Sequence, residues 1–440
     1  MNLKTLILTF FLCAHYLLAW AQTEVVTYYD GIGKPTKERY SILQRDSTKI
    51  HGDYRMFFRS GALMVNGQFQ EGQKHGVFEN FYENGVLQRV THYRNGLRYG
   101  LTEVFYEDKS PLQTAYFEND TLEGEVTQYY KNGSIKNITH FKKGKPDGLV
   151  TQYYPNGNKK EITTYKAGDP NGPTSAYYES GKLKSESVFK QSFLHGYFKT
   201  YYPSGQLSTE AYYEDGSQTG SFSNYFESGT LQAKGLYKNG LLDGEVFNYF
   251  ADGTTKQAFR YLKGKKTGTN IIYFSTGQIR EKSIFSNEEK NVDTEEYDEK
   301  GNLLAKKRFQ EGLKSGVWKY YFTNGKVYVI ERYKNDGLNG ERAVYTDRGK
   351  KSRIESYQNG KLNGLTSIYD KNEHVTEEIT YQFNRKQGEY KKYFKSGKLA
   401  VSGSYHRNKK HKNWIYYKKN GETEKEESYH FGKLVPQQPD

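Results

Sequence analysis

Residues 124–148 read GEVTQYYKNGSIKNITHFKKGKPDG, and this pattern returns every 24 residues along the chain. Repeat positions are counted here from the first glycine, so that Gly124 is position 0 and Tyr129 is position 5. From Gly52 onward, sixteen such repeats follow without insertion or deletion, and positions 5 and 17 are aromatic in all of them. A fixed period of this length is typical of repeat proteins, whose modules complete their packing against their neighbours.

Turn-forming residues divide each repeat. Position 0 is glycine in 14 of the 16 repeats, with Val292 and Lys412 as exceptions, and position 9 is glycine in another 14, with Lys109 and Glu373 as exceptions. The intervening runs are rich in Tyr, Phe, Val, Ile and Thr, which are typical of strands. The sequence therefore predicts an all-β, elongated repeat protein with a single long twisted antiparallel sheet of about sixteen 24-residue β-hairpins.

The pairing within a hairpin follows from the turn. Asn-Gly pairs at positions 8 and 9, such as Asn84-Gly85, favour a two-residue turn. This turn predicts that position 6 pairs with position 11, and that position 17 joins the same apolar face, opposite position 2 of the next repeat. Position 5 then lies on the other face, opposite the lysines of position 12. The alternative is a β-bulge at the adjacent aromatic pair, which would turn both rings inward.

Four segments are predicted along the chain: a signal peptide at 1–21, a degenerate capping hairpin at 22–51, the repeat array at 52–435 with units starting at 52, 76, 100 and so on to 412, and a tail at 436–440. Lys4, the apolar run after it and Ala19-Trp20-Ala21 predict cleavage near Ala21-Gln22 and export to the periplasm, outer envelope or medium. A membrane anchor is the alternative. Pro436 and Pro439 are expected to blunt the last edge of the sheet. Bends or breaks are expected in the repeats that begin at Gly100, Val292 and Gly364, where the pattern changes.

The composition excludes a thick aliphatic core. Only 35% of the residues are hydrophobic, whereas the chain has 42 tyrosines and 44 glycines, which fits a thin sheet lined with amphipathic rings. The net charge is +14, and 14 Lys or Arg stand against 5 Glu between Arg385 and Lys433. Such an excess either attracts an anionic surface or keeps a long sheet soluble.

No motif in the sequence predicts catalysis. The chain has no phosphate-binding GxxxxGK[ST] loop and no GxSxG elbow. His51, His75, His195 and His411 all occupy position 23 of different repeats, which are too far apart to share a metal. We therefore expect a non-enzyme with no cofactor and no metal, no nucleic-acid partner, and no transmembrane segment in the mature chain.

Two stretches carry a family resemblance. Tyr129-Tyr130-Lys131-Asn132-Gly133-Ser134-Ile135, followed by Phe141-Lys142-Lys143-Gly144-Lys145-Pro146-Asp147-Gly148, resembles the bacterial variant of the MORN repeat. The likeness covers about 51–433 and extends to the YwqK group, whose members are labelled antitoxin or immunity components. It implies elongated antiparallel sheets and roles in scaffolding, dimerisation or phospholipid binding. Export does not fit a cytoplasmic antitoxin, but it is compatible with protection against a toxin that reaches the periplasm.

The sequence thus predicts an exported, non-catalytic repeat protein that offers an extended protein-binding or scaffolding surface to an unidentified partner. The first alternative is an antitoxin or immunity protein, and the second is binding of an anionic envelope lipid or polysaccharide. The candidate surface consists of position-5 tyrosines, position-12 lysines and C-terminal lysines. They are Tyr129, Tyr153, Tyr177, Tyr201, Tyr225, Tyr249, Lys136, Lys160, Lys184, Lys391, Lys392, Lys409 and Lys410.

Overall fold

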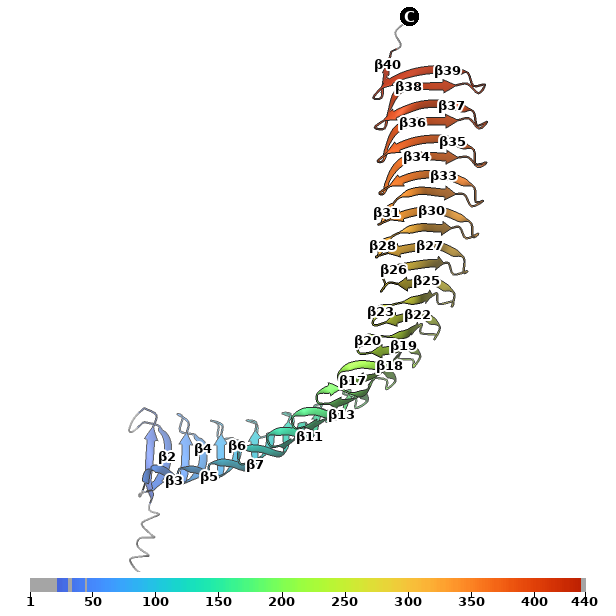
Figure 1. Ribbon diagram of the computed structural model, residues 1–440. Helices are drawn as coiled ribbons and strands as arrows, with labels where there is room; N and C mark the ends of the chain where they lie inside the picture. The colour runs from blue at the N-terminus through green and yellow to red at the C-terminus, as the bar shows by residue number, and fades with distance from the viewer. Residues whose placement is uncertain (1–21, 31–33, 44–45, 437–440) are drawn as a thin grey trace, which may run out of the picture. The chain divides into compact units, whose positions relative to one another are not determined.

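The computed structural model describes residues 22–30, 34–43 and 46–436 (Figure 1). These residues form 40 strands of one antiparallel sheet and no helix. The predicted all-β repeat fold is therefore confirmed. The predicted signal peptide and Pro439 lie outside the described residues. Two compact units divide the chain, Met1–Ser217 (unit 1) and Gln218–Asp440 (unit 2).

The strands of unit 1 are, in chain order, β1 (Gln22–Tyr28), β2 (Thr36–Leu43), β3 (Asp46–Phe57), β4 (Leu63–Gln70), β5 (Gln73–Phe81), β6 (Leu87–Arg94), β7 (Leu97–Phe105), β8 (Pro111–Glu118), β9 (Thr121–Tyr129), β10 (Ile135–Lys142), β11 (Lys145–Tyr153), β12 (Lys159–Lys166), β13 (Asp169–Tyr177), β14 (Leu183–Lys190), β15 (Phe193–Leu194), β16 (Gly196–Tyr201) and β17 (Leu207–Glu214). Strands β1 and β2 pair antiparallel in the segment predicted to be the capping hairpin.

The strands that follow are β18 (Ser217–Tyr225), β19 (Leu231–Lys238), β20 (Leu241–Leu242), β21 (Gly244–Tyr249), β22 (Thr255–Leu262), β23 (Lys265–Lys266), β24 (Gly268–Tyr273), β25 (Ile279–Ser286), β26 (Asn291–Tyr297), β27 (Leu303–Gln310), β28 (Leu313–Lys314), β29 (Gly316–Tyr321), β30 (Val327–Lys334), β31 (Gly337–Leu338), β32 (Gly340–Tyr345), β33 (Lys351–Gln358), β34 (Lys361–Tyr369), β35 (Val375–Gln382), β36 (Arg385–Tyr393), β37 (Leu399–His406), β38 (Lys409–Tyr417), β39 (Thr423–His430) and β40 (Lys433–Val435).

The hairpin turn of each repeat differs from the predicted two-residue turn. The Tyr82 N–H donates to the Val86 carbonyl (2.8 Å), and the Gly85 N–H donates to the Tyr82 carbonyl (2.9 Å). Gly85 has φ 81°, so the loop has three residues and ends in a left-handed glycine. Lys109 (φ 71°) and Glu373 (φ 69°) keep this conformation where the glycine is lost.

A β-bulge changes the pairing inside all sixteen hairpins. In the first, Met56 pairs with Val65 but Phe57 pairs with Leu63, which leaves Met64 at position 12 as the extra residue. Position 5 therefore pairs with position 11, and the predicted pairings of 6 with 11 and of 5 with 12 are wrong. The bulge lies on the second strand, so position 5 keeps its alternation. Positions 5 and 17 thus lie on opposite faces, as predicted.

A second irregularity lies between repeats. Asn66 pairs with Glu79 and Gln68 with His75, so a single residue, Gly67, faces the three residues Gly76–Phe78. Gly76 has φ 75°, a conformation that favours glycine. Because of this bulge, Phe69 pairs with Lys74. The predicted pairing of position 17 with position 2 of the next repeat is therefore wrong.

The repeat that begins at Val292 lacks this second bulge. Phe285 pairs with Val292 without a register shift. The two residues that form the bulge in other repeats instead lengthen the preceding turn, which spans 287–290. The sheet is therefore not broken at this repeat, and a bend there stays a prediction. Strand pairing also continues through the repeats that begin at Gly100 and Gly364.

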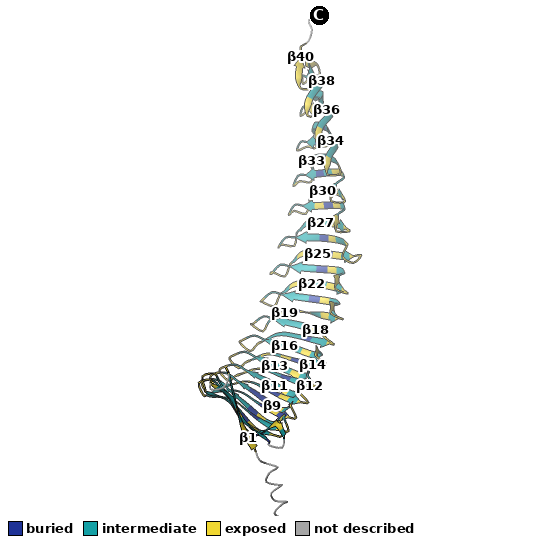
Figure 2. Cartoon of the chain, turned by 90° about the vertical axis from the view of Figure 1, so that its left-hand side faces the viewer, coloured by how far each residue is buried: buried dark blue, intermediate teal, exposed yellow. Residues whose placement is uncertain are grey.

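Rings at positions 2 and 17 form the core on one face, which we call the ring face. Phe78 meets Phe69 at 5.5 Å and Tyr93 at 5.1 Å between ring centroids. A Cβ on Gly67, at position 15, would lie 2.6 Å from the Phe78 ring, so glycine is needed at residue 67 for this ring to pack closely. Buried residues occupy the middle of the strands in both units (Figure 2).

Candidate binding surface

The sheet exposes far more surface than a globular chain of its size. The solvent-accessible area of the whole chain is 27179 Å², whereas a compact monomer of 51.1 kDa would expose about 17,000 Å². In the described part of the chain, no second layer covers either face in either unit. Both faces are therefore available to a partner.

The face opposite the rings, which we call the stripe face, carries exposed apolar side chains in unit 1. They occupy positions 1 and 16, which pair directly, as Leu101 does with Tyr116. Leu149 is 52% exposed and Tyr197 is 63% exposed. The apolar stripe consists of Val77, Leu101, Tyr116, Leu149, Val188 and Tyr197. The sequence did not single out these residues, because positions 1 and 16 vary between repeats.

The predicted position-5 tyrosines also lie on the stripe face. They are half-buried: Tyr129, Tyr153, Tyr177 and Tyr201 in unit 1, and Tyr225 and Tyr249 in unit 2. The Tyr201 hydroxyl donates to Glu186 at position 14 (2.9 Å), and Tyr393 donates to Glu378 in the same way (2.7 Å). Burial, with this hydrogen bond, raises the pKa of Tyr393 to about 12.

The predicted position-12 lysines contact a different ring. Lys136, Lys160 and Lys184 lie over the position-6 rings of Tyr130, Tyr154 and Tyr178, at 5.8, 6.0 and 5.9 Å from ammonium to centroid. Each of these tyrosines also donates its hydroxyl to the position-5 carbonyl of the next repeat, at 2.8, 3.0 and 2.7 Å. The lysines therefore border a row of hydroxyl bonds that join successive hairpins. This row of hydroxyl bonds is indicated in the sequence by a tyrosine at position 6 of every repeat from Tyr82 to Tyr202.

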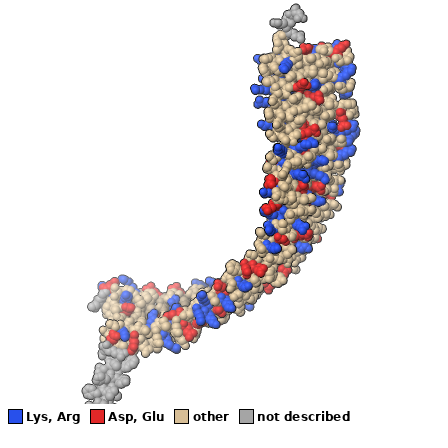
Figure 3. All heavy atoms as spheres, viewed as in Figure 1, with Lys and Arg blue, Asp and Glu red and all other residues tan. Residues whose placement is uncertain are grey.

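The C-terminal lysines do not converge on one patch. Neighbours in β36, Lys391 and Lys392 point to opposite faces, and the Lys391 ammonium pairs with Glu389 (3.0 Å). In β38, Lys409 is exposed near the turn, whereas the Lys410 ammonium lies over the Trp414 ring (4.4 Å). On the molecular face seen in Figure 3, basic and acidic side chains are interspersed along the chain.

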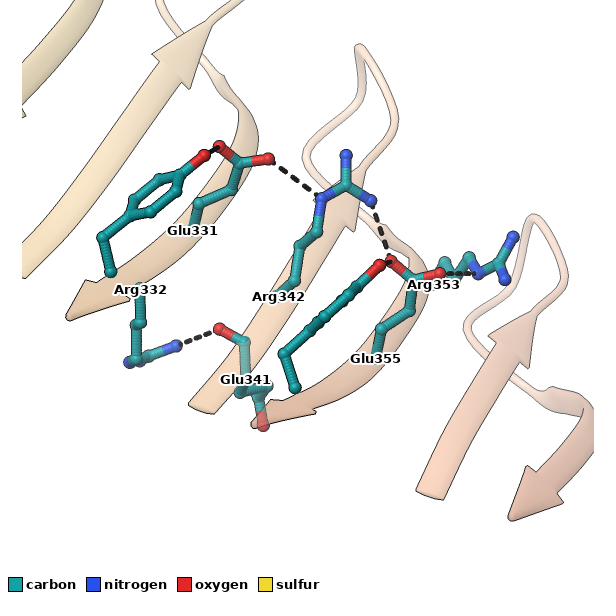
Figure 4. Close-up of polar contacts among 8 residues, drawn as sticks. Glu331, Arg332, Glu341, Arg342, Arg353 and Glu355 are labelled. Atoms are coloured by element: carbon teal, nitrogen blue, oxygen red, sulfur yellow. Dashed lines mark hydrogen bonds and ion pairs between the residues drawn. The ribbon is translucent and has the colours of Figure 1, made fainter. Parts of the chain in front are cut away.

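A polar ladder lies beside the position-17 rings on part of the ring face of unit 2, where Arg342 occupies position 2 (Figure 4). Arg342 joins Glu331 (Nε–Oε1, 3.0 Å) to Glu355 (Nη1–Oε2, 2.9 Å), and Arg353 pairs with Glu355 (2.8 Å). The Glu355 side chain is only 6% exposed. Burial, followed by the hydrogen bond to Glu331, raises the pKa of Tyr333. Acid and base groups are bonded to each other, so the ladder acts as a packing element.

Three histidines gather at the C-terminal end, around Phe431. The His411 ring lies 5.6 Å from His406, 5.7 Å from His430 and 4.8 Å from Phe431. Desolvation, then the neighbouring His406 and His430, lowers the pKa of His411. The spacing of these histidines in the sequence does not reveal the group, because positions 18 and 23 meet only across the turn. Among the described residues, no group of His, Cys, Asp or Glu has the arrangement of a metal site.

The described residues also contain no helix of the length and hydrophobicity needed to cross a membrane.

Comparison with solved structures gives only distant likeness. The crystal structure of TcdB2-TccC3-TEV is 11% identical over 91% of this chain and 27% of that chain, with a TM-score of 0.15. The crystal structure of TcdB2-TccC3 without its hypervariable C-terminal region is 11% identical over 93% of this chain and 26% of that chain, with a TM-score of 0.14. The chain thus spans about a quarter of these proteins, and such scores carry no argument about arrangement or function. A search of curated proteins found no match.

Single repeats of the chain match a family model, which identifies the chain better than its likeness to solved structures does. The MORN repeat variant model matches eight segments, namely 74–95, 122–143, 146–167, 170–191, 194–215, 218–239, 314–335 and 386–407. They occur in both units and keep the 24-residue register. The chain therefore belongs to the MORN-repeat proteins, in the variant class of that repeat.

Proposed function

We propose that this protein is a non-catalytic, exported scaffold whose stripe face in unit 1 binds a protein partner. MORN repeats are consistent with a binding or scaffolding role. The observation that carries the proposal is the single-layer sheet, with its 27179 Å² of accessible surface. A sheet with two open faces offers a long surface without a catalytic pocket, as repeat arrays commonly do.

The apolar stripe favours a protein as the partner. Exposed apolar side chains that gather on one face commonly mark sites of protein interaction, and aromatic residues are enriched in such interfaces. Leu149 and Tyr197 have the exposure and chemistry of interface anchors, because each could bury most of its side chain on binding.

Affinity capture with matched variants tests the proposal. The mature chain, the double variant Leu149→Ser/Tyr197→Ser, and the control Leu97→Ser/Phe193→Ser are used as baits in the native envelope extract. The control residues, Leu97 and Phe193, are also exposed but occupy position 21 at the hairpin edge. We expect a stoichiometric partner with the parent chain and the control, and its loss with the stripe variant.

Equal retention of every captured protein by both variants would overturn the stripe as the binding surface. A toxin that the parent chain captures and inhibits would select the antitoxin alternative.

Export is the second element of the proposal, and it rests on residues 1–21. Fractionation followed by N-terminal sequencing should find a mature chain that begins near Gln22 outside the cytoplasm. A full-length cytoplasmic chain would contradict it.

A further inference from the structure

Three lysine ammonium groups form a regular row along one hairpin edge of unit 1. Lys136, Lys160 and Lys184 each occupy position 12 and lie at nearly the same distance from the tyrosine ring beside them, between 5.8 and 6.0 Å. Equivalent residues in successive repeats are two strands apart, which corresponds to about 9.6 Å. The row is thus a linear array of cations with a fixed period.

The row is held in place. Each lysine lies over a tyrosine whose hydroxyl is bonded to the next hairpin, so the supporting rings are fixed relative to one another. All three lysines are exposed, and within the described residues none of them forms an ion pair with a carboxylate. A preorganised cation that is free of an internal partner loses less entropy on binding an anion.

The local charge balance is one-sided. Positions 7–12 of these three repeats hold six lysines, at 131, 136, 159, 160, 182 and 184, and one acidic residue, Glu179. At the opposite hairpin edge, positions 18–23 hold five lysines and two aspartates, Asp147 and Asp169. The edge with the lysine row therefore has the stronger positive field.

We propose that this lysine row binds a linear acidic polysaccharide that carries one carboxylate per disaccharide. The anions of such a polymer repeat along a line at a spacing close to that of the lysines, so that successive carboxylates meet successive ammonium groups. The tyrosines at position 6 place aromatic rings beside the same lysines, where they can contact the sugar rings. This site is separate from the protein-binding stripe and goes beyond the scaffold function.

Other polyanions fit the period less well. Phosphates along a nucleic-acid strand lie about 3.4 Å apart along the helix axis. Acidic side chains on one face of an extended peptide repeat every second residue, at about 6.7 Å. Neither spacing matches a row with a period of about 9.6 Å.

Hyaluronan, with one carboxylate per disaccharide, serves as the probe, and dextran is the neutral control. Binding to the mature full chain is measured by isothermal titration at two salt concentrations. We expect hyaluronan to bind at low salt and to weaken as salt screens the charges. The variant Lys136→Gln/Lys160→Gln/Lys184→Gln should lose about tenfold in affinity, as expected for three surface ion pairs.

The control variant, Lys142→Gln/Lys166→Gln/Lys190→Gln, removes three exposed lysines with the same period at the opposite edge. It should retain the affinity of the parent chain. Equal losses in both variants would show that net charge alone is responsible and would overturn the site. The proposal would also be overturned if hyaluronan did not bind at low salt, or if phosphatidylglycerol vesicles bound more tightly than hyaluronan. The Leu149→Ser/Tyr197→Ser variant should bind hyaluronan normally, which separates this site from the stripe.

Discussion

At the scale of single residues, small and large side chains are matched across neighbouring strands. Gly403, at position 15, has no positive φ, but a Cβ there would collide with the Trp414 ring of the next repeat. Ala115 occupies the equivalent position where the next repeat has Val126. At these two sites, the size of the side chain at position 15 therefore matches that of position 2 in the following repeat.

Gly403→Ala should destabilise the protein by about 1–3 kcal/mol, because it overpacks the ring face. The same change in a Trp414→Val background should cost little, since Ala115 and Val126 already pack in this way. Urea unfolding of the four proteins in this double-mutant cycle measures the coupling. An equal cost in both backgrounds would rule out the proposed collision.

Tyr154→Phe should lower the free energy of unfolding by about 1 kcal/mol, because the hydroxyl bond to the Tyr177 carbonyl is lost while the ring remains. Tyr153→Phe is the control, since within the described residues its hydroxyl makes no hydrogen bond. Equal stability of the two variants would show that the hydroxyl row does not join the hairpins.

The stability should fall above pH 10. The pKa of Tyr393 is raised from 10.0 to about 12 in the folded chain, so the unfolded chain releases this proton more readily. The contribution of Tyr393 to the free energy of unfolding is complete below pH 10 and is lost as the pH rises through about 12. Denaturant unfolding should show a smaller alkaline loss for Tyr393→Phe than for the parent chain. Tyr417→Phe, whose hydroxyl faces Ser402, is the control, and an identical alkaline loss in both variants would count against the Glu378 contact.

At the scale of the hairpin, two bulges decide which residues share a face. The period, the strands and the turn glycines could be predicted because they depend on local conformation. The pairing could not be predicted from alternation alone, because the extra residue at position 12 and the irregularity at position 0 each change the register between the paired strands. For the same reason, alternation alone places Lys136 opposite the ring of Tyr129, whereas the Lys136 ammonium lies over the ring of Tyr130. The apolar stripe depends on residues that vary between repeats, and its exposure appears only in the folded sheet.

Gly229→Val should destabilise the hairpin of β18 and β19 by about 1–2 kcal/mol, because Gly229 has φ 85° and a β-branched residue resists this conformation. Gly229→Asn should cost less, because asparagine tolerates the left-handed region. Thermal unfolding compares the two. Identical melting of both variants would contradict the assigned turn.

At the scale of the whole molecule, stability within each unit comes from contacts between adjacent hairpins. Bonds from a turn to the start of an earlier strand recur at the repeat period, such as Gly144 N–H to the Leu122 carbonyl (3.0 Å) in unit 1 and Gly264 N–H to the Leu242 carbonyl (2.8 Å) in unit 2. Because every repeat offers its neighbours the same edges, one module should be removable without loss of the others.

The most direct test of this modular account is the deletion of one repeat. Deleting residues 128–151 removes 24 residues and joins position 3 of one repeat to position 4 of the next, whereas deleting 128–150 leaves one residue too many and reverses the faces of the strand. Hydrogen exchange should show unchanged protection in the remaining repeats after the first deletion, and lost protection in the repeats around the junction after the second. Equal loss of protection in both deletions would contradict the account.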